Sequence, residues 1–194
     1  MQFEAGFDKI YGRRCSAVTE LGTFKTRSGQ IVTLRFICPD DAPLLADFFD
    51  RLSYESRRLR FHLYTTKISK ARIWDEARKL SDLNPQLQVA IAATIFEPDR
   101  TEQIVGVARF VRATPAATEA EVAVVVRDDF QRKGLGKHLL LKLAEHAREM
   151  GVTHFTAWVL AENVRLMKLI RGLEIKGLEK ETRYGETRIR APID

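Results

Sequence analysis

The stretch that decides the fold is EAEVAVVVRDDFQRKGLGKHLL, residues 119–140. In residues 122–126, valine and alanine fill both alternating faces, as in a central strand that is buried on both sides. From residue 134 to residue 150, apolar side chains recur at helical spacing, and Gly151 suits a left-handed helix cap. The sequence therefore predicts a buried strand that runs through a short glycine-containing turn into a helix.

The turn between this strand and this helix has the residue types of a phosphate-binding loop. Glycine lets the main chain approach a ligand closely, and the first turn of a helix has N–H groups without partners in the chain. The helix dipole and the neighbouring Arg132, Lys133 and Lys137 add attraction for anions. We therefore expect phosphate groups to bind here.

Two common phosphate-binding patterns do not fit this loop. A Walker loop needs Ser or Thr after its Gly-Lys pair, but His138 follows Gly136 and Lys137. A dinucleotide-binding fingerprint needs a third glycine at the position of Leu139. The pattern Gln/Arg-x-x-Gly-x-Gly/Ala, in contrast, fits completely over residues 131–136.

The remaining chain alternates strand-like and helix-like segments, which predicts an α/β fold with a mixed sheet. The expected strands are residues 23–27, 30–37, 86–96, 103–112, 119–127, 153–160, 175–178 and 182–190. The expected helices are residues 39–52, 53–63, 69–80, 134–150 and 162–172. The length of 194 residues fits one domain, expected at residues 22–194 after an irregular N-terminal extension at residues 1–21.

The net charge of +6 arises from 32 Lys and Arg residues against 26 Asp and Glu residues. Residues 51–72 contain seven of the basic residues and only one acidic residue. Such a cluster attracts polyanions, although a solvated helix face explains it equally well. Nucleic-acid binding is not favoured, because the sequence has no zinc finger, RNP-type strand or basic zipper.

Cysteine and histidine usage predicts neither a disulfide framework nor a metal site. Cys15 and Cys38 are the only cysteines, and we expect both to be reduced thiols. The four histidines lack the spacing of metal ligands, so no metal is expected. The N-terminus has no signal-peptide core, and the longest apolar runs have five residues, whereas a membrane span needs about 20. The expected location is therefore cytoplasmic, with no membrane contact.

The strand, loop and helix of residues 119–140 resemble the acetyl-CoA-binding motif of the GNAT superfamily of N-acetyltransferases. The resemblance covers roughly residues 30–190 in element order. LRFICPDD at residues 34–41 and LSYESRRLRF at residues 52–61 are similar to the GNAT domain of bacterial Pat-type protein lysine acetyltransferases. The resemblance implies a GNAT-like fold, with a central, mostly antiparallel sheet flanked by helices, and an acetyl-CoA-dependent N-acetyltransferase.

The resemblance also implies which residues hold acetyl-CoA. The pantetheine arm is expected along the main chain of Val124, Val125 and Val126, and the pyrophosphate is expected at Gln131, Arg132, Lys133, Gly134, Leu135, Gly136 and Lys137. Asn163 matches an asparagine that reaches the cofactor, but a helix-cap role fits it equally well. Ile170 stands where many relatives have a tyrosine that acts as general acid, so acid catalysis from that helix is not expected.

Glu121 lies ten residues before Gln131, where many family members have a general-base glutamate. The reaction needs a base, because an amine attacks a thioester only when neutral and a free lysine has a pKa of about 10.4. Deprotonation at pH 7 costs about 4.6 kcal/mol, and a positioned base contributes about 10²–10⁴-fold. Glu119 is an equally available neighbour on the same strand face, and a solvated acid at the strand end is the alternative for Glu121.

The expected partners are acetyl-CoA and an amine acceptor, either a protein lysine or a small amine. By resemblance, Arg57, Arg60 and Phe61 lie in the helix pair that lines the acceptor entrance, although packing or solvation explains them at least as well. A basic entrance would favour acidic acceptors. The alternative function is a non-catalytic acyl-CoA sensor or interaction module, and the sequence leaves a homodimer open.

Overall fold

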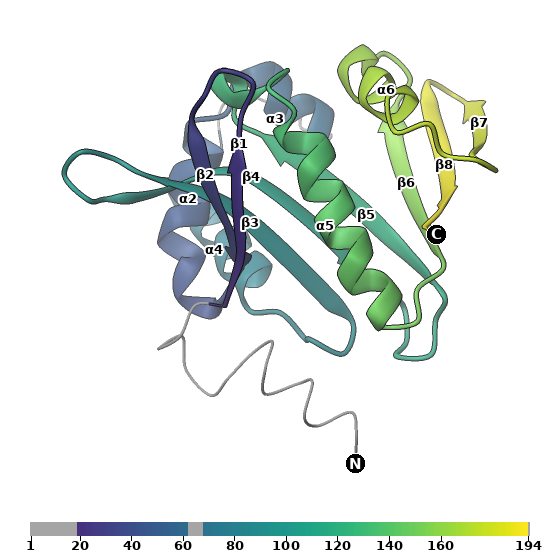
Figure 1. Ribbon diagram of the computed structural model, residues 1–194, viewed down its shortest axis with the longest axis horizontal. Helices are drawn as coiled ribbons and strands as arrows, with labels where there is room; N and C mark the ends of the chain where they lie inside the picture. Colours follow the sequence, from purple (N-terminus) through teal and green to yellow (C-terminus); the bar gives the residue numbers. More distant parts are fainter. Residues whose placement is uncertain (1–18, 62–67, 194) are drawn as a thin grey trace.

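An eight-stranded sheet runs through residues 19–61 and 68–193, the part of the chain that the computed structural model describes (Figure 1). The strands lie in the order β1-β2-β3-β4-β5-β6-β8-β7. They are β1 Glu20–Lys25, β2 Ile31–Phe36, β3 Gln88–Phe96, β4 Glu102–Val111, β5 Glu119–Val126, β6 His154–Leu160, β7 Glu179–Arg183 and β8 Glu186–Pro192. Every neighbouring pair is antiparallel except β5 and β6, which confirms the expected mixed, mostly antiparallel sheet.

Helices cover both faces of this sheet. They are α2 Ala42–Asp50, α3 Tyr54–Phe61, α4 Lys70–Ser81, α5 Leu135–Glu149 and α6 Val164–Arg171, with short 3-10 turns at Pro39–Asp41 and Asp128–Phe130. The apolar stripe of α5 (Leu135, Leu139, Leu143, Ala144 and Ala147) packs on one face. Side chains of α2 and α4 pack on the opposite face, and α6 packs against β6 and β8.

The strands β5 and β6 pair only at their beginnings and then diverge. Their parallel register consists of Glu119 with His154, Ala120 with Phe155, and Glu121 with Thr156. Both strands continue beyond these pairs, and the widening space between them is visible in Figure 1. Residues 122–126 are therefore half-buried, with one main-chain edge that is not paired to β6.

Most strands and helices lie where the sequence predicts them, but the two ends differ. β1 begins at Glu20, inside the stretch 1–21 that was expected to be irregular, and residues 1–18 lie outside the described residues. The strand expected at residues 175–178 is wrong, because β7 lies at residues 179–183. A tight turn at Tyr184 and Gly185 divides the expected strand 182–190, and both residues have positive φ, as a type I′ hairpin turn requires.

A buried ionic cluster joins β2, the start of the first helical segment and β4. Arg35 is 3% exposed, and its Nη1 and Nη2 donate to the two carboxylate oxygens of Asp41 at 2.7 Å each. Its Nε donates to Glu102 at 2.9 Å. Burial alone would lower the pKa of Arg35, but the hydrogen bonds to both carboxylates raise it, so this charge is fully paired inside the protein.

The state of Cys38 differs from the expectation that both cysteines are reduced thiols. The structure records Cys38 in a disulfide, so the expectation of a reduced thiol is wrong for this residue. Two cysteines cannot form a disulfide framework, but they suffice for one bridge, and spacing alone does not reveal it. Cys15 lies outside the described residues. Within the described part of the chain, no helix has the length and apolar composition to cross a membrane.

Candidate active site

The free edge of β5 presents main-chain groups toward the diverging β6. Arg127 N donates to Val105 O on β4 at 2.9 Å, and main-chain groups alternate in direction along an antiparallel strand. The N–H and C=O groups of Val126 and Val124 therefore face away from β4, toward the space beside β6. Val125, which was also expected to contact pantetheine, faces β4 with its main chain, opposite Val107.

Gln131 joins the end of β5 to the helices on both sides of the open edge. Its Nε2 donates to Val126 O at 2.9 Å and to Ser56 Oγ of α3 at 3.1 Å. Its Oε1 accepts a hydrogen bond from Arg165 Nη1 of α6 at 3.1 Å. Both ends of the Gln131 side-chain amide are thus hydrogen-bonded within the protein, and these bonds fix the position of the start of the loop.

The loop that follows Gln131 leaves its main-chain N–H groups available. Arg132 has φ +61° and Gly134 has φ +90°, so two left-handed residues turn the chain into the N-terminus of α5. Within the described residues, the main-chain N–H groups of residues 132–137 have no hydrogen-bond acceptor. Consecutive free N–H groups at a helix N-terminus attract an anion, and the helix dipole adds to this attraction.

Two lysines of the loop donate hydrogen bonds to neighbouring segments, and Gly136 lies close to α6. Lys133 Nζ donates to Gln30 Oε1 at 3.0 Å, and Lys137 Nζ donates to Gly172 O, at the end of α6, at 2.8 Å. A Cβ at Gly136 would lie 2.9 Å from Leu169 Cδ1, where α5 approaches α6. Glycine at this position therefore lets the first turn of α5 pack closely against Leu169 of α6.

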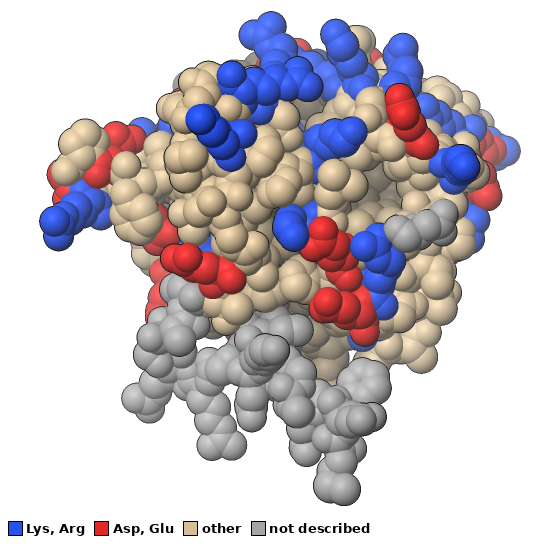
Figure 2. All heavy atoms as spheres, in the orientation of Figure 1, with Lys and Arg blue, Asp and Glu red and all other residues tan. Residues whose placement is uncertain are grey.

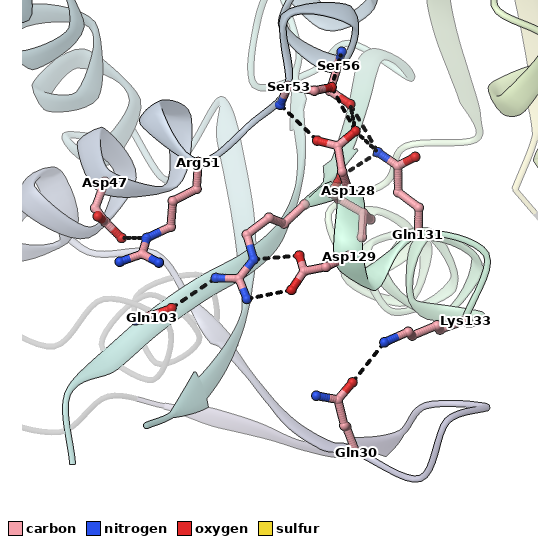
Figure 3. A network of polar contacts seen from close by, with 12 residues as sticks. Gln30, Asp47, Arg51, Ser53, Ser56, Gln103, Asp128, Asp129, Gln131 and Lys133 are labelled. Carbon is pink, nitrogen blue, oxygen red and sulfur yellow. Dashed lines mark hydrogen bonds and ion pairs between the residues drawn. The ribbon is translucent and has the colours of Figure 1, made fainter. Parts of the chain in front are cut away.

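Asp128 fastens the loop to the N-terminus of α3 (Figure 3). Its carboxylate accepts hydrogen bonds from Ser53 N at 2.9 Å, Ser53 Oγ at 2.8 Å and Ser56 Oγ at 2.8 Å. Burial alone would raise the pKa of Asp128, but these hydrogen bonds and the charge of Arg165 outweigh it and lower the pKa. The carboxylate therefore holds the N-terminus of α3 beside the loop of residues 131–136. Its negative charge also interacts favourably with the helix dipole of α3.

Exposed ion pairs link α3 and α6 across the diverging strands. Arg58 of α3 pairs with Glu162, directly before α6, and Arg165 Nη2 of α6 lies 3.5 Å from Glu55 Oε2 of α3. Exposed pairs of this kind contribute about 0–1 kcal/mol each, so they can exchange partners without much cost. Arg165 also lies 3.9 Å from Asp128, so this exposed arginine contacts both α3 and the start of the loop.

The two candidate general bases on β5 differ in their partners. Glu119 Oε1 lies 2.7 Å from Arg190 Nε, and this hydrogen bond lowers the pKa of Glu119. Glu121 is exposed and makes no hydrogen bond or ion pair with a described residue. Because Glu121 is also the last residue of β5 that pairs with β6, its carboxylate lies where the two strands begin to diverge.

A match to a protein-family model identifies the family of this chain. The model of the acetyltransferase (GNAT) family matches residues 58–173, which contain β5, the loop and α6. The chain belongs to the GNAT acetyltransferase family.

Similar proteins include Pat-type acetyltransferases. Acetyltransferase Pat of Mycolicibacterium smegmatis is 37% identical over 93 residues, which cover 42% of this chain and 28% of that protein. The GNAT domain of S. lividans PAT superposes with a TM-score of 0.76 at 28% identity, over 89% of this chain and 96% of that domain. YncA of Salmonella typhimurium, solved with acetyl-CoA, has a TM-score of 0.54 at 20% identity, over 84% and 94% of the two chains.

The two residues at α6 that the resemblance singles out both have structural contacts in this GNAT chain. Asn163 is 8% exposed, and its Oδ1 accepts a hydrogen bond from Leu166 N at 3.0 Å, so it caps α6. Ile170, at the tyrosine position of many family members, is 7% exposed and packs with Val159 and Ile189. The position therefore contributes to a small apolar core and offers no hydroxyl to a leaving group.

Basic side chains gather along one edge of the GNAT domain. Figure 2 shows Lys and Arg along the upper edge of the face, where the β1–β2 turn, α3, the loop and α6 lie in Figure 1. Exposed members are Lys25, Arg27, Arg132, Lys137, Arg165 and Lys168. A positive edge beside free N–H groups suits a ligand that carries several phosphates. In the same described part of the chain, no three His, Cys, Asp or Glu side chains cluster as metal ligands.

Sequence reasoning did not single out Ser53, Ser56, Asp128 or Arg165 as parts of the site. The only local signal was the Ser-x-x-Ser spacing at the start of α3, which is typical of a helix cap. Arg165 lies 34 residues from Gln131 along the chain, and Asp128 lies 75 and 72 residues from Ser53 and Ser56, so only the fold brings these groups together.

Proposed function

We propose that this chain transfers the acetyl group of acetyl-CoA directly to an amine acceptor, with Glu121 as general base. The observation that carries the proposal is the open edge of β5 between a carboxylate at one end and a row of free N–H groups at the other. The similar YncA, solved with acetyl-CoA, supports the choice of cosubstrate. The chain spans 28% of the length of the curated Pat relative, so the whole relative's activity is not transferred.

The dimensions of β5 fit the cosubstrate. The pyrophosphate would bind the N–H groups of residues 132–137. The pantetheine arm would pair with the main chain of Val124, on the edge of β5 from which β6 has diverged. At about 3.3 Å per residue, the strand from Glu121 to Arg127 covers about 20 Å. An extended arm therefore places the thioester near Glu121.

Glu121 would then accept the proton of the attacking amine. The neutral amine forms a bond to the thioester carbon, and a main-chain N–H of β5 stabilises the tetrahedral oxyanion. The C–S bond breaks, and the acetyl group remains on the amine. Because thiols have a pKa of about 8.5, the thiolate can leave without a side-chain acid, which fits the buried Ile170.

The acceptor is a protein lysine or a small amine, and similarity to Pat-type domains favours the lysine. A second candidate function is a non-catalytic acyl-CoA sensor. The apolar Ile170 favours this alternative, since it offers no hydroxyl that would assist catalysis.

Two measurements test the proposal. Acetyl-CoA should raise the melting temperature of the protein, and thiol release should follow when a panel of amines and lysine-containing proteins is added. A melting temperature that acetyl-CoA leaves unchanged contradicts both functions. A clear stabilisation without thiol release from any amine leaves the sensor as the function.

A further inference from the structure

Arg60 belongs to α3, which packs against β5, and its guanidinium lies within electrostatic range of Glu121. Its Nε is buried and has no hydrogen-bond partner in the part of the chain that the structure describes. The charge of Glu121 acts on Arg60, but the two side chains do not form an ion pair. Arg58 and Arg165, in contrast, both have carboxylate partners. A buried donor without an acceptor destabilises a protein, so this donor indicates a binding role.

Aromatic rings hold this guanidinium in place. The Cζ atom of Arg60 lies 4.9 Å from the ring centroid of Phe61, and Phe61 contacts Phe49 with centroids 5.3 Å apart. Arg57, one turn earlier, lies 5.4 Å from the ring of Phe49, and its Nε is also buried without a partner. The two arginines are therefore positioned by stacking.

A second arginine, Arg109, acts on Arg60 together with Glu121. Arg109 of β4 pairs with Ala123 and Val111 pairs with Glu121, so Arg109 and Glu121 lie diagonally on the same face of the sheet. Burial, and then the charge of Arg109, lower the pKa of Arg60 to about 10, while the charge of Glu121 opposes this effect. Two positive charges thus face one carboxylate, and Arg109 also donates to Gln88 at 3.1 Å.

We propose that Arg60 binds a carboxylate of the acceptor, and that the acceptor is an amine with a carboxylate close to the reacting nitrogen. This inference rests on the proposed function, because it places the amine at Glu121. A negative Glu121 near a positive Arg60 is complementary to an ammonium group near a carboxylate. The bound carboxylate would pair with the guanidinium of Arg60, whose Nε–H has no acceptor among the described residues. Either a lysine next to Asp or Glu, or a small amino acid, has this chemistry.

Matched acceptor pairs test the inference. One pair is a blocked pentapeptide with lysine between two aspartates and the same peptide with two asparagines. The other pair is 4-aminobutyrate and its amide. Binding of each compound to the protein saturated with coenzyme A is measured by calorimetry, and turnover with acetyl-CoA is measured in parallel. For at least one pair, we expect the carboxylate compound to bind at least about tenfold more tightly, as a charge-assisted hydrogen bond allows.

Variants assign this preference to Arg60. Arg60→Gln should reduce it to less than about twofold, whereas Arg60→Lys should retain part of it because the charge remains. Arg78→Gln is the matched control. Arg78 of α4 also stacks on an aromatic ring, with its Cζ 5.4 Å from the ring centroid of Trp74, but its side chain is exposed. Acetyl-CoA affinity, measured in each variant, shows that the fold is intact.

The outcomes separate the two proposals. Equal binding within both pairs, or a preference that Arg60→Gln leaves unchanged, overturns the carboxylate site. A preference that depends on Arg60 but comes without turnover supports the carboxylate site and contradicts the proposed transferase activity. The pair that shows the preference distinguishes a peptide from a small amino acid as the source of the carboxylate.

Discussion

Glu121 of β5 and Thr156 of β6 form the last pair before the two parallel strands diverge. A parallel sheet normally continues its hydrogen bonds along both strands, so a divergence in the middle leaves main-chain groups of β5 unpaired. These groups lie between the carboxylate of Glu121 and the N-terminus of α5. A ligand that pairs with the free edge therefore meets the carboxylate at one end and the free N–H groups at the other.

Replacing Glu121 by glutamine should lower kcat by about 10²–10⁴-fold, because the attacking amine loses its general base. The Kd for acetyl-CoA should stay within about twofold, since the glutamate does not lie at the N–H groups that bind phosphate. Steady-state kinetics and calorimetry measure the two quantities. Glu119→Gln is the control: it removes the ion pair with Arg190, and kcat should change by less than about fivefold. A larger loss in Glu119→Gln than in Glu121→Gln would reverse the assignment of the base.

Replacing Gly134 by alanine should weaken acetyl-CoA binding by at least about tenfold. Its φ of +90° strains any residue other than glycine by about 1–2 kcal/mol, and the new Cβ would lie 3.3 Å from Phe24 Cζ, so either the ring or the loop must move slightly. Gly151→Ala has a similar strain, with φ +80°, but no atom lies within 4 Å of its new Cβ. Both variants should therefore lower the melting temperature, and only Gly134→Ala should raise the Kd. Equal Kd values would contradict the role of this loop.

Replacing Asp128 by asparagine should lower the free energy of unfolding by about 1–2 kcal/mol at pH 7, because hydrogen bonds to a charged group are lost. The pKa of Asp128 is lowered in the folded state, so its stabilisation is present above the unfolded pKa of about 3.9. The stabilisation is lost as the pH falls through the lower, folded pKa. Urea denaturation should thus show a constant difference from pH 7 to pH 5 that shrinks below about pH 4. The exposed Asp75→Asn serves as control, and a difference independent of pH would contradict the prediction.

Replacing Arg35 by methionine should destabilise the domain by about 3–5 kcal/mol, because Asp41 and Glu102 lose their partner and Asp41 is buried. The exposed pair of Arg51 with Asp47 provides the comparison, and Arg51→Met should cost less than about 1 kcal/mol. Denaturant titration measures both. A loss below about 1 kcal/mol for Arg35→Met would show that the buried cluster adds little to stability.

The sequence predicts the elements whose side chains have a clear apolar period. The runs of β5 and α5 are long and buried, so their period reveals them. β7 was misplaced because all five of its residues are exposed and charged or polar, so no alternation marks it. Pairing with β8 across a two-residue turn forms this strand, and that is a property of the tertiary structure.

The candidate site was predictable only where it is local. The spacing of Gln131 and the glycines predicts the loop, because all its parts lie within a few residues. The fold alone reveals that Asp128 contacts Ser53 and that Arg60 lies within electrostatic range of Glu121, since these interactions join segments about 60–75 residues apart. No local pattern distinguishes an arginine on a solvated helix face from one with a buried, unpartnered Nε.

The crystal structure of the complex with coenzyme A tests the central claim most directly. The diphosphate oxygens should lie within about 3.2 Å of main-chain nitrogens of residues 132–137, with the pantetheine arm beside Val124 and the thiol near Glu121. Coenzyme A bound elsewhere, or a loop whose N–H groups are hydrogen-bonded within the protein when the ligand is present, would contradict the account.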